Sequence, residues 1–304
     1  MQLEKKLSTY TPANIPSKRW VRIKSFVKKL VLASASTKYG ANELASVISQ
    51  HVAWCDVIAY ELTPAVVLNR DVIEQFIAQG CAGLGDGTRS NYRSILFAVA
   101  EAVLPPTQIL RRGKPIKGSA PSVPYTQTEI TALLHSAQSQ HTPYQRHGAL
   151  TLLAAGLGAG LGAEDLLVVR GTDVTTTENT TRVSVEGRRP REVIVFTRWA
   201  DRLQVLADAV EGGWLFLPNR QSTRYKATAN FIKSLSTGGD TPTFSTQRLR
   251  ATWVCHHLNI GTPLPNLVKA AGVTTLHPFA RYLKFLAEVE ASQAEPWFQG
   301  DRCR

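Results

Sequence analysis

Cysteine is scarce in this sequence, and its few copies are scattered. The four cysteines, Cys55, Cys81, Cys255 and Cys303, include no C-x-x-C pair. Their spacing therefore matches neither the common zinc sites nor a disulfide framework. We expect all four to be reduced, and we expect no metal and no cofactor.

Long hydrophobic runs and repeats are also missing. No stretch of apolar residues is long enough to cross a membrane, and the first residues, MQLEKKLSTY, lack the apolar core of a signal peptide. The composition, 43% hydrophobic and 19% charged, is ordinary for a water-soluble chain. We expect a cytoplasmic, nucleoid-associated protein without a membrane partner, whose 304 residues divide into two domains.

Acidic residues are outnumbered by basic ones. The chain has 35 Lys and Arg against 23 Asp and Glu, a formal net charge of +12. Residues 1–120 hold 16 basic and 8 acidic residues, so this part contributes most of the excess. Such a balance indicates a polyanionic partner. The alternative is a solvated basic face with no such partner.

The first 104 residues predict a helical domain behind a basic arm, residues 1–16. Residues 17–35 alternate apolar and basic side chains at helical spacing, which predicts an amphipathic helix. Such a helix can lie on a membrane surface, but packing in a domain with its lysines facing phosphate or water is our preferred interpretation. Further helices are predicted at 41–59, 70–79 and 88–103.

The helix at 88–103 follows a glycine-rich turn and begins with side chains suited to nucleic acid. These residues can contact phosphates and base edges together; they are Thr88, Arg89, Asn91, Tyr92 and Arg93. The alternative is an ordinary solvated helix start. Residues 105–124 then form a Pro- and Gly-rich linker whose four charges could follow a DNA backbone, namely Arg111, Arg112, Lys114 and Lys117.

Residues 125–304 mix helices with short strands. Thr126 and Glu129 have capping-box spacing before a helix, and another helix is predicted at 143–157. The glycines that follow do not form a nucleotide-binding motif, because no strand precedes them and no Gly-Lys-Ser/Thr follows. Strands are predicted at 180–187, 191–196 and 214–217 and a helix at 198–211. Basic residues that we expect to contact a nucleic acid occur in the hairpin turn and near 221–236: Arg188, Arg189, Arg224 and Lys226.

The stretch from Thr246 to Phe285 places arginines and a tyrosine on successive helices. The first helix begins with Arg248 and Arg250, where a helix N-terminus favours anions. A Gly-Thr-Pro break at 261–263 separates it from the next helix. A last helix, with Leu276, Phe279, Leu283 and Leu286 as its inward stripe, is expected to carry Tyr282.

The pattern L-R-x-T-W, a helix, a glycine turn and R-Y resembles the C-terminal half of the tyrosine recombinase (phage integrase) family. Arg250 matches the second catalytic arginine of that family, and Tyr282 matches its nucleophile. The stretch from Leu166 to Val174 also aligns, with Asp165 at the acidic position. Three family positions hold other residues here, since the first arginine, the box histidine and the later His or Trp fall on Gly162, Gln247 and Val273.

The resemblance implies a mainly α fold with a small β-sheet in two domains. It assigns residues 17–104 to a helical SAM-like core-binding domain and residues 125–304 to an α+β domain of the catalytic type. In the family a lysine on the β-hairpin acts as general acid, but this sequence has no lysine between Lys117 and Lys226. The resemblance therefore implies retained DNA contacts and missing catalytic groups.

Our leading hypothesis is a sequence-specific double-stranded DNA-binding protein that has lost strand cleavage, such as a repressor of a phage or mobile element. One alternative is an active integrase that uses Tyr282 as nucleophile. In it, displaced residues would fill the vacant roles, the candidates being Arg170, Arg188, His256, His257 and His277. A second alternative is an architectural subunit of a recombinase. Self-association through the C-terminal helix and tail is a further expectation.

Overall fold

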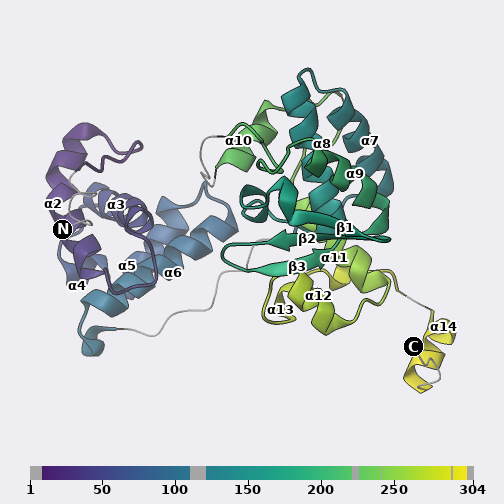
Figure 1. Cartoon of the computed structure of the whole chain (residues 1–304). Helices are drawn as coiled ribbons and strands as arrows, with labels where there is room; N and C mark the ends of the chain where they lie inside the picture. Colours follow the sequence, from purple (N-terminus) through teal and green to yellow (C-terminus); the bar gives the residue numbers. More distant parts are fainter. Residues whose placement is uncertain (1–8, 110–120, 221–225, 240, 289, 300–304) are drawn as a thin grey trace. The chain divides into compact units, whose positions relative to one another are not determined.

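A computed structural model describes residues 9–109, 121–220, 226–239, 241–288 and 290–299. The chain divides into two compact units, Met1–Ala120 and Pro121–Arg304, and each is described by itself. Among the described residues, no helix is both long enough and apolar enough to span a bilayer. The predicted class, mainly helical with one small sheet, is confirmed (Figure 1).

The first unit is all helical. Its helices are α2 (Ser17–Ala33), α3 (Ala41–Val57), α4 (Pro64–Val67), α5 (Arg70–Gln75) and α6 (Asp86–Val103), with a π-helical turn at Phe76–Gly80 and a 3-10 turn at Pro106–Gln108. The four predicted helices are present. The short helix α4 was not predicted, because four residues are too few to show a helical period.

Helix α2 shows why the sequence forms this unit. Its buried residues, Trp20, Ile23, Val27, Leu30 and Val31, recur every three or four positions and therefore share one face. That face packs mainly on α3. Four lysines lie outside that buried face, Lys18 and Lys29 exposed and Lys24 and Lys28 half-buried, and none has an ion-pair partner within the described part of the chain.

A histidine lies in the core of this unit. His51 on α3 is fully buried, its Nε2 lies 2.8 Å from the Val67 carbonyl oxygen, and its ring centroid is 4.7 Å from that of Phe76. Burial lowers the pKa of His51 from 6.5 to about 4, although the hydrogen bond to Val67 opposes the shift. The folded protein therefore holds this ring neutral.

We expect the protein to lose stability as pH falls from about 6.5 to about 4. The unfolded chain protonates His51 in that window and the folded chain does not, so the contribution is complete above pH 6.5 and amounts to at most about 3 kcal/mol. Denaturant unfolding at a series of pH values should show a shallower slope for His51→Gln. The exposed His141→Gln is the control, and equal slopes for wild type and His51→Gln would contradict the expectation.

The second unit joins a three-stranded sheet to a set of helices. The helices are α7 (Gln127–Gln138), α8 (Pro143–Ala159), α9 (Thr197–Asp208), α10 (Ala227–Ser234), α11 (Thr246–Asn259), α12 (Leu264–Ala270), α13 (His277–Ala280) and α14 (Ala291–Gln299). The strands are β1 (Val174–Thr177), β2 (Thr180–Val185) and β3 (Arg191–Ile194). The expected capping box of Thr126 and Glu129 begins α7.

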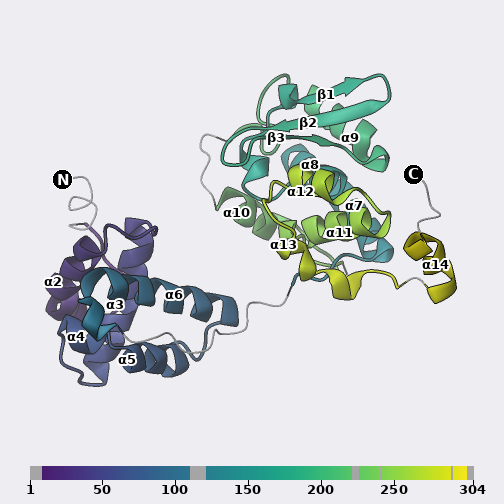
Figure 2. The same ribbon diagram turned by 90° about the horizontal axis from the view of Figure 1, so that it is seen from below.

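The sheet is antiparallel in the order β1-β2-β3. Val183 pairs with Val174 on one side and with Val193 on the other, and these three valines are buried. Helix α9 contacts β1 and β2, and Figure 2 shows it beside the sheet. Strand β1 was not predicted, because its four residues, Val-Thr-Thr-Thr, bury only the first side chain.

The glycines of α8 set the distance between helices. A Cβ on Gly156 would lie 2.8 Å from Leu249 Cβ of α11, and one on Gly158 would lie 2.9 Å from Trp199 Cβ of α9. Helices α9 and α11 therefore pack directly on the α8 backbone. The glycine-rich run that resembled a phosphate loop is a packing surface, and it fixes the position of α11.

Two predicted elements are wrong. Residues 214–217 form no strand, since only an isolated bridge joins Trp214 to Arg170 and Leu217 has a positive φ of 55°. The expected last helix is reduced to α13 and a 3-10 turn at Leu283–Phe285. Of its proposed inward stripe only Phe279 is buried, and Leu283 is 63% exposed. Without a buried stripe, no core contact holds a longer helix together.

Candidate functional site

A cleft of about 380 Å³ in the second unit collects the charged residues of the site. It lies where the segment after α8, the β2–β3 turn, α11 and the end of α12 meet. Its lining residues are Gly162, Ala163, Glu164, Asp165, Val168, Glu186, Arg188, Arg189, Arg191, Arg250 and Ala271. Four arginines therefore face three carboxylates.

Arg250 reaches the cleft from α11, which begins at Ser245, whose hydroxyl accepts the Arg248 N–H at 3.3 Å. The Arg250 guanidinium donates from Nη1 to the Gly160 carbonyl at 2.6 Å and from Nη2 to the Ala271 carbonyl. These carbonyls belong to the C-terminal caps of α8 and α12. A cation is favoured there because helix ends leave carbonyls unpaired and carry partial negative charge. Arg250 thus joins two helix ends and remains 23% exposed toward the cleft.

Asp165 forms the centre of the charge cluster. Its carboxylate accepts two hydrogen bonds from Arg191, at 3.1 and 2.8 Å, and one from the Gly162 N–H at 2.9 Å. The Arg250 Nη1 lies 3.9 Å from the same carboxylate. Burial alone would raise the pKa of Asp165, but Arg191, the Gly162 N–H and Arg250 hold it below its usual value. Asp165 is therefore a paired carboxylate.

Arg250 is also affected by the surrounding charges. Burial lowers the pKa of its guanidinium, Asp165 and Tyr282 oppose that shift, and Arg191 and Arg189 add to it. The guanidinium still carries its charge at any physiological pH, because an arginine side chain is not deprotonated in proteins.

Tyr282 lies near Arg250 without lining the cleft. Its half-buried ring packs against the core of the second unit, and the Arg281 guanidinium lies 5.9 Å from its centroid. The residue precedes the 3-10 turn at Leu283–Phe285. Tyr282 opposes the lowering of the Arg250 pKa, so the two positions matched to the recombinase family lie within electrostatic range of each other.

The family positions that hold other residues supply no cation to the cleft. Gly162 contributes only its backbone N–H to Asp165. Gln247 is exposed, and its Oε1 accepts a hydrogen bond from Ser245 Oγ at 3.1 Å. Val273 packs against the apolar core.

Of the five displaced candidates, only Arg188 lines the cleft. Arg170 stacks on the Trp214 ring at 4.2 Å and donates to the Gly212 carbonyl at 3.3 Å. The rings of His256 and His257 are 5.7 Å apart on α11, each with a buried Nε2 that has no hydrogen-bond partner among the described residues. Burial, with His256 beside it, lowers the pKa of His257 to about 4. His277 is exposed at the start of α13.

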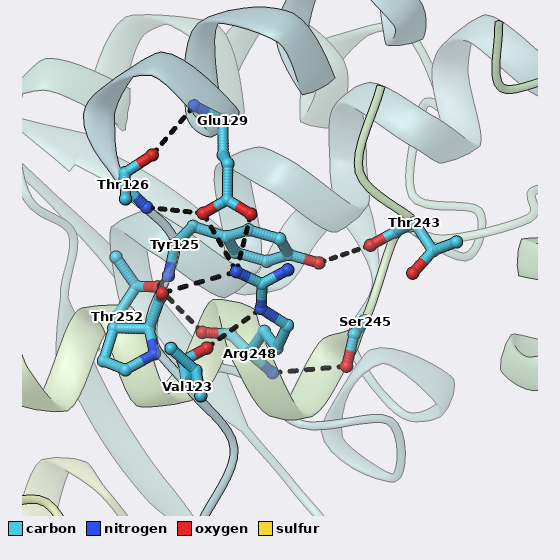
Figure 3. Close-up of polar contacts among 9 residues, drawn as sticks. Val123, Tyr125, Thr126, Glu129, Thr243, Ser245, Arg248 and Thr252 are labelled. Carbon is cyan, nitrogen blue, oxygen red and sulfur yellow. Dashed lines mark hydrogen bonds and ion pairs between the residues drawn. The ribbon is translucent and has the colours of Figure 1, made fainter. Parts of the chain in front are cut away.

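Arg248, which we expected to contact DNA, is held inside the protein (Figure 3). It donates from Nε to the Val123 carbonyl at 2.9 Å and from Nη2 to both Glu129 carboxylate oxygens at 2.8 and 2.9 Å. Its guanidinium also lies 3.8 Å from the Tyr125 ring centroid, and the Tyr125 hydroxyl donates to the Thr243 carbonyl at 2.6 Å. Arg248 therefore anchors residues 123–125 to α7 and α11.

The α6 residues expected to contact DNA fall into two groups. Thr88 and Asn91 are exposed, and Asn91 donates to Glu43 at 3.4 Å. Arg89 is half-buried, donates from Nε to the Ile77 carbonyl at 3.3 Å and lies 3.5 Å from the Asp86 carboxylate.

The other two α6 residues face the core of the first unit. Tyr92 accepts a hydrogen bond from Gln50 at 2.9 Å. Arg93 is buried, donates from Nε to both Glu74 oxygens at 3.0 and 2.8 Å, and lies over the Phe97 ring. Arg93 therefore ties α6 to α5 in this structure.

Several expected contacts have no structural description. Arg111, Arg112, Lys114, Lys117 and Arg224 lie outside the described residues. Lys226 is exposed directly before α10, and Arg188 and Arg189 are exposed in the β2–β3 turn. Among these, the turn arginines are the ones that share the cleft with Arg250.

Arg191 is the residue of the cleft that sequence reasoning did not find. It is the first residue of β3, and its side chain is only 3% exposed. The sequence did contain a signal. Arg191 lies two residues before Val193 on the same strand, so both side chains point to the buried face. A charge buried at such a position requires a partner.

No protein-family model matches the chain, and no curated protein matches it in sequence. Solved structures do match. The XerH site-specific recombinase bound to difH substrate has a TM-score of 0.59 at 14% identity, with 98% of this chain and 92% of that chain covered. A lambda integrase dimer bound to a COC' core site has a TM-score of 0.59 at 14% identity, covering 88% and 98%.

A third structure gives the same result. The Tn1549 transposon integrase in complex with transposon right-end DNA has a TM-score of 0.53 at 15% identity, covering 98% of each chain. At such low identity the likeness concerns the fold alone, and it extends over nearly the whole chain. The fold expected from the Arg250–Tyr282 pattern is thus confirmed, and this chain has the fold of the tyrosine recombinases.

Proposed function

We propose that the protein binds double-stranded DNA in a sequence-specific manner and has lost strand cleavage. One observation carries this proposal. The cleft keeps Arg250 and gains two exposed turn arginines, while the positions matching the first arginine and the histidines of active recombinases provide no cation and the hairpin holds no lysine. Adjacent phosphates of a duplex can be held there by Arg250, Arg188 and Arg189.

Cleavage would require more than a held phosphate. The tyrosine must attack phosphorus while several cations stabilise the developing charge and an acid protonates the departing oxygen. The arginines of the turn are poor acids, because a guanidinium does not give up its proton in proteins. The arrangement therefore favours recognition over reaction, and we propose that the protein acts as a repressor or other regulator of a phage or mobile element.

The first unit supplies a second basic surface. The exposed Thr88 and Asn91 at the start of α6 and the four lysines of α2 are the surface features that suit DNA in this unit. Phosphate contacts by lysine fix orientation, and polar side chains at a helix start can read base edges. We propose that both units contact the duplex.

The tail supports the expected self-association. Helix α14 carries Phe298 with 92% of its surface exposed. A large exposed aromatic side chain on a terminal helix suits burial against another chain. We propose that α14 mediates association between copies on DNA.

An active integrase is the second candidate, favoured by the closeness of Tyr282 to Arg250. An architectural subunit of a recombinase is the third candidate. A genome-wide footprint of the bound protein separates the candidates. Sites upstream of genes support a regulator, whereas crossover sites at element ends support the other two.

A salt titration tests the DNA contact of the cleft. For Arg188→Ala/Arg189→Ala, we expect the slope of log affinity against log salt to become shallower by about 1.8, because each lost phosphate contact removes about 0.9. Fluorescence anisotropy on a duplex of mixed sequence measures it. The control is Arg198→Ala, an exposed arginine of α9 outside the cleft. If the double variant keeps the wild-type slope, the cleft does not bind DNA.

A further inference from the structure

Arg191 links four segments around the cleft. Its guanidinium donates four hydrogen bonds, two to the Asp165 carboxylate, one to the Ala270 carbonyl at 2.8 Å and one to the Arg189 carbonyl at 3.0 Å. A guanidinium has five N–H donors, so most of its capacity is used inside the protein. With 3% of the side chain exposed, Arg191 is not placed to bind a phosphate directly.

The bond to Arg189 fixes the exposed turn between β2 and β3. The last regular pair of this hairpin is Val185 with Arg191, and residues 186–190 beyond it are all exposed. Arg191 therefore holds the backbone of the turn from the buried side, through its hydrogen bond to the Arg189 carbonyl. The direction in which Arg188 and Arg189 extend over the cleft depends on that bond.

The bond to Ala270 places Arg191 beside Arg250 at one helix end. The two guanidiniums bind consecutive carbonyls at the end of α12, Ala270 for Arg191 and Ala271 for Arg250. Gly272 follows with φ of 62°, and a Cβ there would lie 3.0–3.1 Å from the Arg191 guanidinium. The Asp165 carboxylate, paired with Arg191, lies 3.9 Å from Arg250 Nη1, so the same ion pair also acts on the charge of Arg250.

We propose that Arg191 is the positioning residue of the DNA-binding cleft: paired with Asp165, it orients the turn arginines beside Arg250 toward adjacent phosphates. The inference rests on the proposed DNA binding. The Arg191–Asp165 ion pair then determines whether the exposed turn arginines contribute to DNA affinity. Lysine at this position keeps the charge but loses the forked contact with the carboxylate.

A double-mutant cycle tests the proposal on the full chain with a duplex of mixed sequence. Arg189→Ala should lower affinity and reduce the salt slope by about 0.9 in the wild-type background. In the Arg191→Lys background the same change should have no further effect, because the turn no longer reaches the phosphate. Arg182→Lys is the matched control, since Arg182 forms an exposed pair with Glu192 on the same hairpin.

Each outcome has a separate meaning. Additive effects of Arg189→Ala and Arg191→Lys would overturn the positioning role while leaving the DNA contact of the cleft intact. No effect of Arg189→Ala in the wild-type background would overturn the DNA contact itself, and the positioning role with it. Asp165→Asn serves as second variant if Arg191→Lys unfolds, and it should abolish the Arg189 contribution in the same way.

Discussion

A nicked duplex incubated with the wild-type protein is expected to give no covalent adduct at Tyr282. The substrate places a nick beside the binding site, so that one cleavage event would release a short strand and trap the enzyme. A denaturing gel then detects any protein joined to DNA. Wild type and Tyr282→Phe should give the same gel and bind the duplex with equal affinity.

The expectation follows from the groups present around Tyr282. Removing one preorganised donor from such a site typically costs on the order of 10²–10³ in rate. The matching positions are Gly162, Gln247, Val273 and a hairpin without lysine, so several such losses combine, even when they are not additive. The guanidinium of Arg191, which lines the same cleft as Arg250, is bound to Asp165.

A gain-of-function variant sharpens the experiment. Gly162 is the first position to restore, because a Cβ there would be in ordinary contact with Asp165 Oδ2, at 3.6 Å. An adduct with Gly162→Arg/Gln247→His but not with wild type would indicate a scaffold that lacks only these groups. An adduct with wild type that Tyr282→Phe abolishes would restore the integrase hypothesis.

Asp165→Ala is expected to lower the free energy of unfolding by about 3–5 kcal/mol, the usual cost of removing one partner of a buried ion pair. The change leaves the Arg191 guanidinium buried without its carboxylate and removes the acceptor of the Gly162 N–H. Equilibrium denaturation in urea measures the difference at constant salt.

The control for this variant is Asp71→Ala. Asp71 forms an exposed pair with Arg70 at 2.9 Å, and such pairs contribute about 0–1 kcal/mol. A similar small loss for Asp165→Ala would mean that the Arg191–Asp165 pair carries little stability. The cleft would then be less rigid than its hydrogen bonds indicate.

The sequence predicted those parts of the fold that depend on local periodicity and capping. Helix α2 has five buried residues at helical spacing, and Thr126 and Glu129 form the capping box that their spacing indicated. The tyrosine recombinase fold followed from the motif around Arg250 and Tyr282. The prediction of a long helix after Leu276 was wrong. A stripe of apolar residues forms a stable helix only when other elements cover it, and Leu276 and Leu283 are exposed.

The candidate site was harder to predict, because pairing between charges is not local. Arg93 and Arg248 have the same appearance in sequence as Arg188 and Arg189. Yet Arg93 is paired with Glu74 and Arg248 with Glu129, so both charges are largely neutralised within the protein. Arg191 was overlooked for the same reason, since its carboxylate is 26 residues away in the chain.

The arginines of the second unit respond differently to ionic strength. Arg191 is shielded from solvent ions by burial, whereas Arg188 and Arg189 stand in water, where mobile ions weaken their attraction for a polyanion. Concentrated salt should therefore release the protein from heparin or another polyanionic matrix while leaving it folded. The same purification step that strips away contaminating DNA would preserve the cleft.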